Sequence, residues 1–253
     1  MNLQIEGFFI RTMSLIGCLS LFLSCDDGFE SSLLKGTVSE VVVPSKTYDT
    51  IVYVSVNEES IPVYLSIPKE CTSSPLPAVV VLHGSDGMWK NHNPETGTMS
   101  GQNSEWRDLF DSNCIIGAYV DSFTERGCTT RTGKWTSPPD NFKISSQFIR
   151  PQDAYVTLAL LRKLTHENGT PLVRPNDIGL LGFSDGASAV ASTLFDTDAV
   201  PPNWEWTQTF DGKNYNSSTG VLPPVSPPKE GGFSGGVFYY GGSAGYNYWG
   251  ASP

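Results

Sequence analysis

The sequence predicts an α/β protein with a mostly parallel sheet and helices on both faces. Two segments, Ala78–Leu82 and Asp177–Phe183, are nearly unbroken apolar runs. Such runs are typical of strands that are buried on both faces. Between them, residues 150–165 place Ala154, Leu158 and Leu161 at helical spacing. Strands that alternate with helices favour a parallel sheet.

The elements before this helix follow from local patterns. Apolar and β-branched residues predict strands over Thr50–Val56 and Ile61–Pro68, joined by a polar turn over Asn57–Ser60. Apolar residues at helical spacing predict a short helix over Ser104–Asn113, and a third buried strand is expected over Cys114–Phe123.

The helix over residues 150–165 carries start signals, because Pro151 suits a first turn and Asp153 complements the positive end of the helix dipole. A small-residue helix is expected over Ser184–Phe195 and a last strand over Gly235–Gly242. The Pro- and Asn-rich stretch between Asp198 and Gly232 is longer than an ordinary loop, which is typical of a functional or disordered segment.

The first residues have the pattern of an export signal. Arg11 precedes an apolar run over Met13–Ser24, which is too short to span a bilayer comfortably. The ending at Cys25 resembles a bacterial lipobox, so we expect residues 1–24 to be a lipoprotein signal peptide and Cys25 to be lipidated. Cys18 is a second candidate, and an ordinary signal peptide is a third interpretation; each implies export. Residues 25–48 would then form a polar tether, and residues 49–253 the folded α/β domain.

Composition limits the partners. A net charge of −10 over 253 residues, without a basic cluster, argues against nucleic-acid binding. With Cys25 lipidated, Cys71, Cys114 and Cys128 retain thiols, which allows one bridge and one free thiol in an oxidising compartment. Cys71 and Cys114 each precede an expected strand, so a bridge between them is the pairing we predict.

The motif that carries chemistry is Gly182-Phe183-Ser184-Asp185-Gly186, between an expected strand and an expected helix. This pattern fits the nucleophile elbow G-x-S-x-G, in which a sharp turn exposes a serine Oγ at the carboxyl edge of the sheet. The two glycines let the strand and the helix approach each other. The N–H of Asp185 is placed to donate to an oxyanion.

A second segment, His83-Gly84-Ser85, ends the expected strand over Ala78–Leu82. The N–H of Ser85 is the other candidate oxyanion donor. We interpret His83 as a structural residue, and Asp86 as either a part of the substrate entrance or solvated surface.

Four blocks together resemble the dienelactone hydrolase family of α/β-hydrolases: "PLPAVVVLHGSDG", "YVDSFTERG", "RPQDAYVTLALLRKL" and "IGLLGFSDGASAVAS". The resemblance covers about Ile61 to Gly242. It implies hydrolysis of a small-molecule carboxylic ester or lactone through a serine acyl-enzyme, with no metal or organic cofactor. Within these blocks we expect Asp121 and Arg126 to brace a loop, and Arg150 and Asp153 to fix the start of a helix.

The general base is the missing part. In α/β-hydrolases the acid and the histidine of the triad follow the serine in the chain, yet no Asp, Glu or His follows Tyr240 here. The sequence therefore predicts either a truncated reading frame that lacks the last strands and helices, or a substitute from earlier in the chain. His92 is the substitute that we consider, because its loop leaves the same sheet edge as Ser184. We expect His166 to lie at the far end of a helix, on the opposite edge.

Two consequences remain as expectations. Without further strands, Val237–Tyr240 would form an exposed apolar edge that invites aggregation. The alternative function is a non-catalytic exported binding lipoprotein on a hydrolase fold, in which the aromatic segments "NWEW" and "YNYW" would stack on sugars. A non-functional gene fragment is a third possibility.

Overall fold

A computed structural model describes residues 3–5, 49–71, 74–130, 144–146, 149–194, 207–210, 213–216 and 227–241. The expected signal peptide and tether, with Cys18 and Cys25, lie outside the described residues except for Leu3–Ile5, which form strand β1. The segments "NWEW" and "YNYW" also lie outside them.

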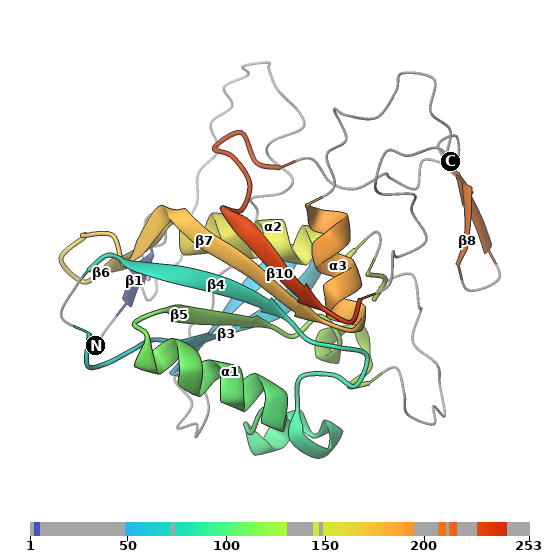
Figure 1. The fold of residues 1–253 in the computed structure, drawn as a ribbon, viewed down its shortest axis with the longest axis horizontal. Helices are drawn as coiled ribbons and strands as arrows, with labels where there is room; N and C mark the ends of the chain where they lie inside the picture. Colours follow the sequence, from blue (N-terminus) through green and yellow to red (C-terminus); the bar gives the residue numbers. More distant parts are fainter. Residues whose placement is uncertain are drawn as a thin grey trace, which may run out of the picture.

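A six-stranded sheet forms the centre of the described structure (Figure 1). Its strand order is β10-β7-β4-β5-β3-β2, in which the first four strands run parallel and β3 is antiparallel to both β5 and β2. The strands are β2 (Thr50–Val56), β3 (Glu59–Ser66), β4 (Leu76–Leu82), β5 (Ile116–Val120), β7 (Val173–Phe183) and β10 (Gly235–Tyr239). The predicted mostly parallel sheet is confirmed.

Two small antiparallel pairs complete the described strands. Strand β1 pairs with β6 (Leu164–His166), and β8 (Thr207–Phe210) pairs with β9 (Lys213–Asn216). The pair β8–β9 lies in the stretch between Asp198 and Gly232, most of which is outside the described residues.

Helices cover both faces of the sheet. Helices α2 (Arg150–Leu161) and α3 (Asp185–Thr193) lie on one face, and α1 (Gly101–Ser112) lies on the other (Figure 1). Three short 3-10 turns, η1 (Lys90–His92), η2 (Pro94–Thr96) and η3 (Thr124–Arg126), follow the carboxyl ends of β4 and β5.

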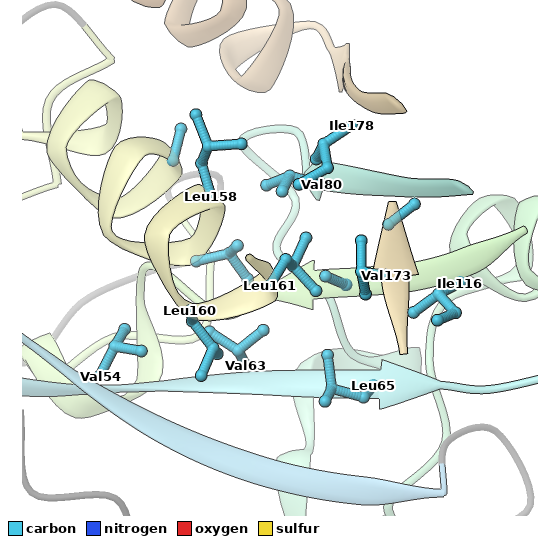
Figure 2. Close-up of a cluster of buried hydrophobic side chains, with 14 of the residues drawn as sticks. Val54, Val63, Leu65, Val80, Ile116, Leu158, Leu160, Leu161, Val173 and Ile178 are labelled. Atoms are coloured by element: carbon cyan, nitrogen blue, oxygen red, sulfur yellow. The ribbon is translucent and has the colours of Figure 1, made fainter. Parts of the chain in front are cut away.

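The larger apolar core lies between α2, α3 and the sheet. In Figure 2, Leu158, Leu160 and Leu161 of α2 lie among the valines and leucines of the strands. A second buried cluster lies on the α1 side, where Val81 and Tyr119 pack with Phe183. Because β4 sends alternate side chains into both clusters, it is buried on both faces, as its unbroken apolar sequence predicts.

Two local predictions are wrong. The turn between β2 and β3 contains two residues, because Val56 pairs directly with Glu59. Asn57 and Glu58 both have positive φ, which is the requirement of a type I′ turn. The helix over residues 150–165 ends at Leu161, and Leu164–His166 form β6, so His166 belongs to a strand instead of a helix end.

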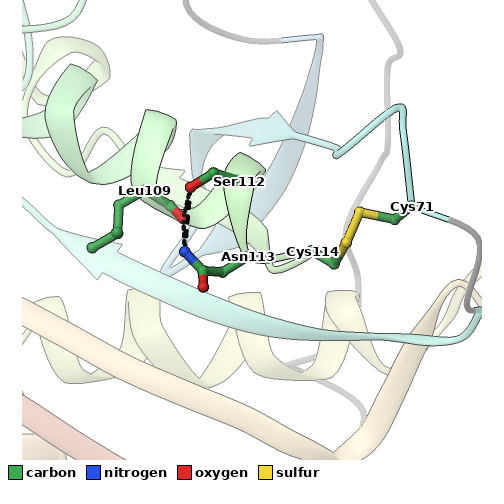
Figure 3. Close-up of a disulfide and its surroundings, with 5 residues drawn as sticks. All are labelled: Cys71, Leu109, Ser112, Asn113 and Cys114. Carbon is green, nitrogen blue, oxygen red and sulfur yellow. Dashed lines mark hydrogen bonds between the residues drawn. A yellow bond between two sulfur atoms is a disulfide. The ribbon is translucent and has the colours of Figure 1, made fainter.

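The predicted disulfide between Cys71 and Cys114 is confirmed (Figure 3). Cys71 follows β3 and Cys114 precedes β5, so the bridge joins neighbouring strands at the amino end of β5. Asn113, the residue before Cys114, caps the carboxyl end of α1, where its Nδ2 donates to Leu109 O over 2.8 Å. Cys128 is buried and is not part of a disulfide, as the cysteine count predicts.

Strand β10 pairs with β7 and is an outer strand of the described sheet. Val237, Phe238 and Tyr239 are 52%, 43% and 41% exposed. The predicted apolar edge is therefore present. Among the described residues, none of the helices has the length and apolar character that a bilayer crossing requires.

Candidate active site

Ser184 lies at the turn between β7 and α3. Its φ of 51° and ψ of −113° are rare for a residue with a side chain, and the surrounding bonds hold it there. The N–H of Ser184 donates to Tyr239 O over 3.0 Å, and Ser184 O accepts from the N–H of Ser188 in α3. Because Ser184 is only half-buried, this turn leaves part of the residue accessible at the carboxyl end of the sheet.

The flanking glycines are required by close backbone approaches. A Cβ on Gly182 would lie 2.7 Å from Val190 Cγ2, and one on Gly186 would overlap Leu82 O and lie 2.5 Å from His83 O. Any side chain at either position would therefore push α3 away from β7 or β4. This is the physical reason for the glycine spacing in the motif.

The segment after β4 lies against this turn. A Cβ on Gly84 would be 3.5 Å from Ser184 Cβ, so the structure brings His83-Gly84-Ser85 beside the serine. Ser85 and Asp185, whose N–H groups are the candidate oxyanion donors, are both half-buried. Ser85 O accepts from Thr130 Oγ1 over 3.2 Å, which ties this segment to the loop after β5.

His83 itself is buried. Its ring packs edge-on against Phe123, with 4.4 Å between the ring centroids, and its Nδ1 lies 2.8 Å from Gly84 O. These contacts agree with our interpretation of His83 as a structural residue. Asp86 is exposed, and its backbone oxygen contacts His92.

Arg150 does more than fix the start of α2. Its buried guanidinium donates from Nη1 to Asp185 Oδ2 and from Nη2 to His83 O, each over 2.7 Å. It also lies over the Phe123 ring, with Cζ 5.3 Å from the centroid. Arg150 therefore joins the segment after β4 to the serine turn. The sequence contains no local signal for this role, because the partners are 35 and 67 residues away.

A second buried arginine braces the loop after β5, as predicted. Arg126 makes two 2.8 Å bonds to the carboxylate of Asp153, one bond to Glu59, and one to Ser122 O. Burial alone would lower the pKa of Arg126, but the Asp153 and Glu59 carboxylates outweigh burial and raise it. Asp153 thus holds a loop as well as the first turn of α2.

Asp121 also holds that loop, as predicted. Its carboxylate accepts from the indole N–H of Trp89 over 2.7 Å and from the backbone N–H groups of Phe123 and Thr124. The carboxylate of Asp121 thus binds groups of the fold itself, so we assign Asp121 a structural role.

The histidines are distributed over both ends of the sheet. His92 is partly exposed, with Nδ1 3.0 Å from Asp86 O and Nε2 3.8 Å from Asp86 Oδ1. His166 lies at the opposite, amino end, where its Nε2 is 2.8 Å from Ser74 Oγ. In the described part of the chain, Ser184 Oγ has no hydrogen bond to a histidine.

An aromatic cluster beside the serine turn was not predicted. The ring of Phe183 stacks on that of Tyr239, and Trp106 of α1 contacts both rings. The ring of Tyr240 contacts that of Tyr239. Gln102 of α1 donates to the Tyr240 hydroxyl over 2.5 Å. The three contributing elements are far apart in the chain, so periodicity could not reveal this cluster. Among the described residues, no group of three His, Cys, Asp or Glu side chains is arranged to hold a metal ion.

No protein-family model and no curated protein sequence matches the chain. Several solved structures do. An acetyl xylan esterase from Paenibacillus sp. R4 is 16% identical with a TM-score of 0.40, and the match covers 64% of this chain and 52% of that one. Est1E from Butyrivibrio proteoclasticus is 13% identical with a TM-score of 0.36, covering 56% and 44%.

A dienelactone-hydrolase-type protein from Klebsiella pneumoniae subsp. pneumoniae MGH 78578 is 15% identical with a TM-score of 0.34, covering 62% of this chain and 53% of that one. The chain thus spans about half the length of these proteins. These matches are too distant to place the chain in the family of any of these proteins. Its class follows from its own strand order and from the serine turn between β7 and α3, which together are the arrangement of an α/β-hydrolase fold.

Proposed function

We propose that this protein is a carboxylic ester or lactone hydrolase of the dienelactone hydrolase type that acts through an acyl-enzyme on Ser184. One observation carries the proposal: Ser184 has positive φ at a strand-to-helix turn whose glycines admit no side chain. Ser184 itself is half-buried and belongs to neither of the two apolar clusters described above. Strained backbone of this kind is concentrated at functional sites.

The chemistry follows from the groups around the turn. Ser184 Oγ would attack the ester carbonyl carbon, and the carbonyl oxygen would become an oxyanion. The N–H groups of Ser85 and Asp185 are the donors that we propose for it. The carbon–oxygen bond to the alcohol then breaks, so the acyl group stays on Ser184 Oγ and the alcohol leaves with the proton that Oγ has lost. Water then hydrolyses the acyl-enzyme, which releases the acid and returns a proton to Oγ.

Proton transfer is the weak step of this site. Since Ser184 Oγ makes no hydrogen bond to a histidine within the described residues, we propose that acylation and deacylation of Ser184 are both slow. His92 is the candidate base, because it lies in the loop that follows the carboxyl end of β4, and it contacts Asp86. In a measured serine protease, the loss of a triad member leaves only about 10³–10⁴-fold catalysis over water.

A panel of activated aryl esters tests the proposal. The purified full chain should hydrolyse at least one of them slowly, and Ser184→Ala should remove this activity. His92→Ala should lower the wild-type rate of hydrolysis only if His92 accepts the proton from Ser184 Oγ. Hydrolysis that survives Ser184→Ala would contradict the proposal. Absent hydrolysis combined with binding on a glycan array would favour the non-catalytic lipoprotein.

We also propose that the protein is exported and anchored by a lipid on Cys25. Support comes from the short apolar run over Met13–Ser24 before that cysteine. Labelled palmitate should be incorporated by the wild type and lost in Cys25→Ala. Incorporation that is lost in Cys18→Ala instead would move the site.

A further inference from the structure

We infer that Arg150 is a positioning residue that sets the separation of the two backbone segments bearing the proposed oxyanion donors. The inference rests on the proposed function. In this role Arg150 contacts neither the substrate nor Ser184 Oγ. It acts through His83 O and the Asp185 carboxylate, each of which lies in one of the two segments.

The geometry supports this role through one rigid group. The guanidinium is planar, and its two Nη atoms make the two bonds, so the positions of His83 O and Asp185 Oδ2 are coupled. The bond to His83 O orients the peptide that leads into Gly84 and Ser85. The bond to Asp185 holds the residue whose own N–H is the second donor. The ring of Phe123 packs against a face of the guanidinium.

Stability alone does not account for this arrangement. The side chain of Arg150 has no exposed surface and that of Asp185 only 11%. A buried ion pair of this kind often contributes little net stability compared with apolar residues of similar size, because both charges lose their hydration. Orientation is what such a pair can supply, and a misplacement of about 1 Å at a reacting group lowers rates by roughly 10²-fold.

Arg126 provides a matched control. The side chain of Arg126 is as buried as that of Arg150. It pairs with the carboxylate of Asp153 in α2, the helix that contains Arg150. Its other partners, Glu59 and Ser122 O, belong to β3 and the loop after β5, so it contacts neither donor segment. Replacing Arg126 disrupts a comparable ion pair but leaves both bonds of Arg150, to His83 O and to Asp185, in place.

The test compares wild type, Arg150→Met, Arg150→Lys and Arg126→Met as full chains. The second-order rate constant for phosphonylation of Ser184 by a fluorophosphonate is measured well below each unfolding midpoint. The final number of labels per chain is measured by intact mass. This end point reports the folded fraction, whereas the rate constant reports the geometry around Ser184.

We expect Arg150→Met to lower the rate constant by roughly 10²-fold, as the loss of an oxyanion donor does, while the end point stays at one label per chain. Arg126→Met should lower the unfolding midpoint but keep a rate constant close to wild type. Lysine can replace only one of the two bonds. Arg150→Lys should therefore be intermediate, roughly tenfold slower, which corresponds to the loss of one charged hydrogen bond.

Equal rate constants for Arg150→Met and wild type, or equal losses in Arg150→Met and Arg126→Met, would overturn the inference alone. If Arg150→Met does not fold, Arg150→Lys decides, because a wild-type rate constant in that variant would also overturn it. A wild type that is not labelled on Ser184 would refute the proposed function, and the inference with it.

Discussion

The two ends of the central sheet are held together by different means. At the amino end, the disulfide between Cys71 and Cys114 joins neighbouring strands, and the side-chain contact between His166 Nε2 and Ser74 Oγ is exposed. At the carboxyl end, two buried arginines bind carboxylates and carbonyls from several elements.

The difference separates stability from orientation. A disulfide closes a loop and removes freedom from the unfolded chain, but it does not aim a backbone group. Hydrogen bonds from a guanidinium are directional, and they fix the peptides on which they act. In open α/β sheets, ligands bind outside the carboxyl ends of the strands, and this is the end at which the two fully buried arginine side chains, Arg126 and Arg150, make their bonds here.

Removing the disulfide should produce the largest loss of stability. The bridge spans 43 residues, for which loop-closure entropy predicts about 4 kcal/mol. Cys71→Ser with Cys114→Ser should therefore lower the free energy of unfolding by about that amount in urea. The phosphonylation rate of Ser184 in the folded fraction should stay unchanged; a large fall in this rate would contradict the separation of the two ends.

A methyl group at the carboxyl end should reduce both stability and reactivity. In Gly186→Ala the new Cβ would overlap Leu82 O, and such overpacking destabilises by about 1–3 kcal/mol. Because α3 must move, phosphonylation of Ser184 should also slow strongly.

Gly235→Ala is the matched control, since a Cβ on Gly235 would meet nothing within 4 Å. Its unfolding free energy should change by no more than about 0.5 kcal/mol. Equal effects of the two substitutions would show that the close approach at Gly186 does not hold the serine turn.

Alkaline pH should weaken the contact between α2 and α3. Burial raises the pKa of Tyr155 to about 12, and its hydroxyl donates to Thr193 O over 2.7 Å. Above pH 10, near the ordinary pKa of tyrosine, the unfolded chain loses this proton while the folded protein keeps it, so stability falls as pH rises towards 12.

Tyr155→Phe should therefore be less sensitive than wild type between pH 10 and 12, as measured by urea unfolding at each pH. The exposed Tyr240→Phe serves as the control. An unchanged pH dependence in Tyr155→Phe would rule out this contribution.

The smallest effect on stability is expected at the outer strand. Phe238 is 43% exposed on β10, so Phe238→Lys should change the free energy of unfolding by no more than about 0.5 kcal/mol. A lysine on an edge strand discourages pairing with other chains. Sedimentation should show less self-association than in wild type. Unchanged self-association would show that the chains associate through a surface other than β10.

Local sequence patterns predicted most of the sheet and the serine turn. The runs around Val80 and Leu181 indicate buried strands because apolar periodicity is a local property. The turn after Val56 was predicted, but as four residues instead of two, since glutamate is an unusual residue for a left-handed position. The end of α2 was missed because Leu164–His166 pair with residues near the start of the chain.

The parts of the candidate site that sequence could not predict depend on distant contacts. Arg150 was interpreted as a helix-start residue because only its sequence neighbours could be considered, whereas its partners lie directly after β4 and at the start of α3. The cluster of Trp106, Phe183 and Tyr239 likewise forms only after α1, β7 and β10 come together. In both cases the topology creates the contact, and no spacing along the chain encodes it.

The central claim is that Ser184 is presented for nucleophilic attack at the carboxyl end of the sheet. The most direct measurement is to incubate the full chain with an activated aryl acetate, quench in acid and locate the acetyl group by peptide mass mapping. We predict one acetyl group per chain, on Ser184 and absent from Ser184→Ala. An unmodified chain, or acetylation at other residues only, would contradict the claim.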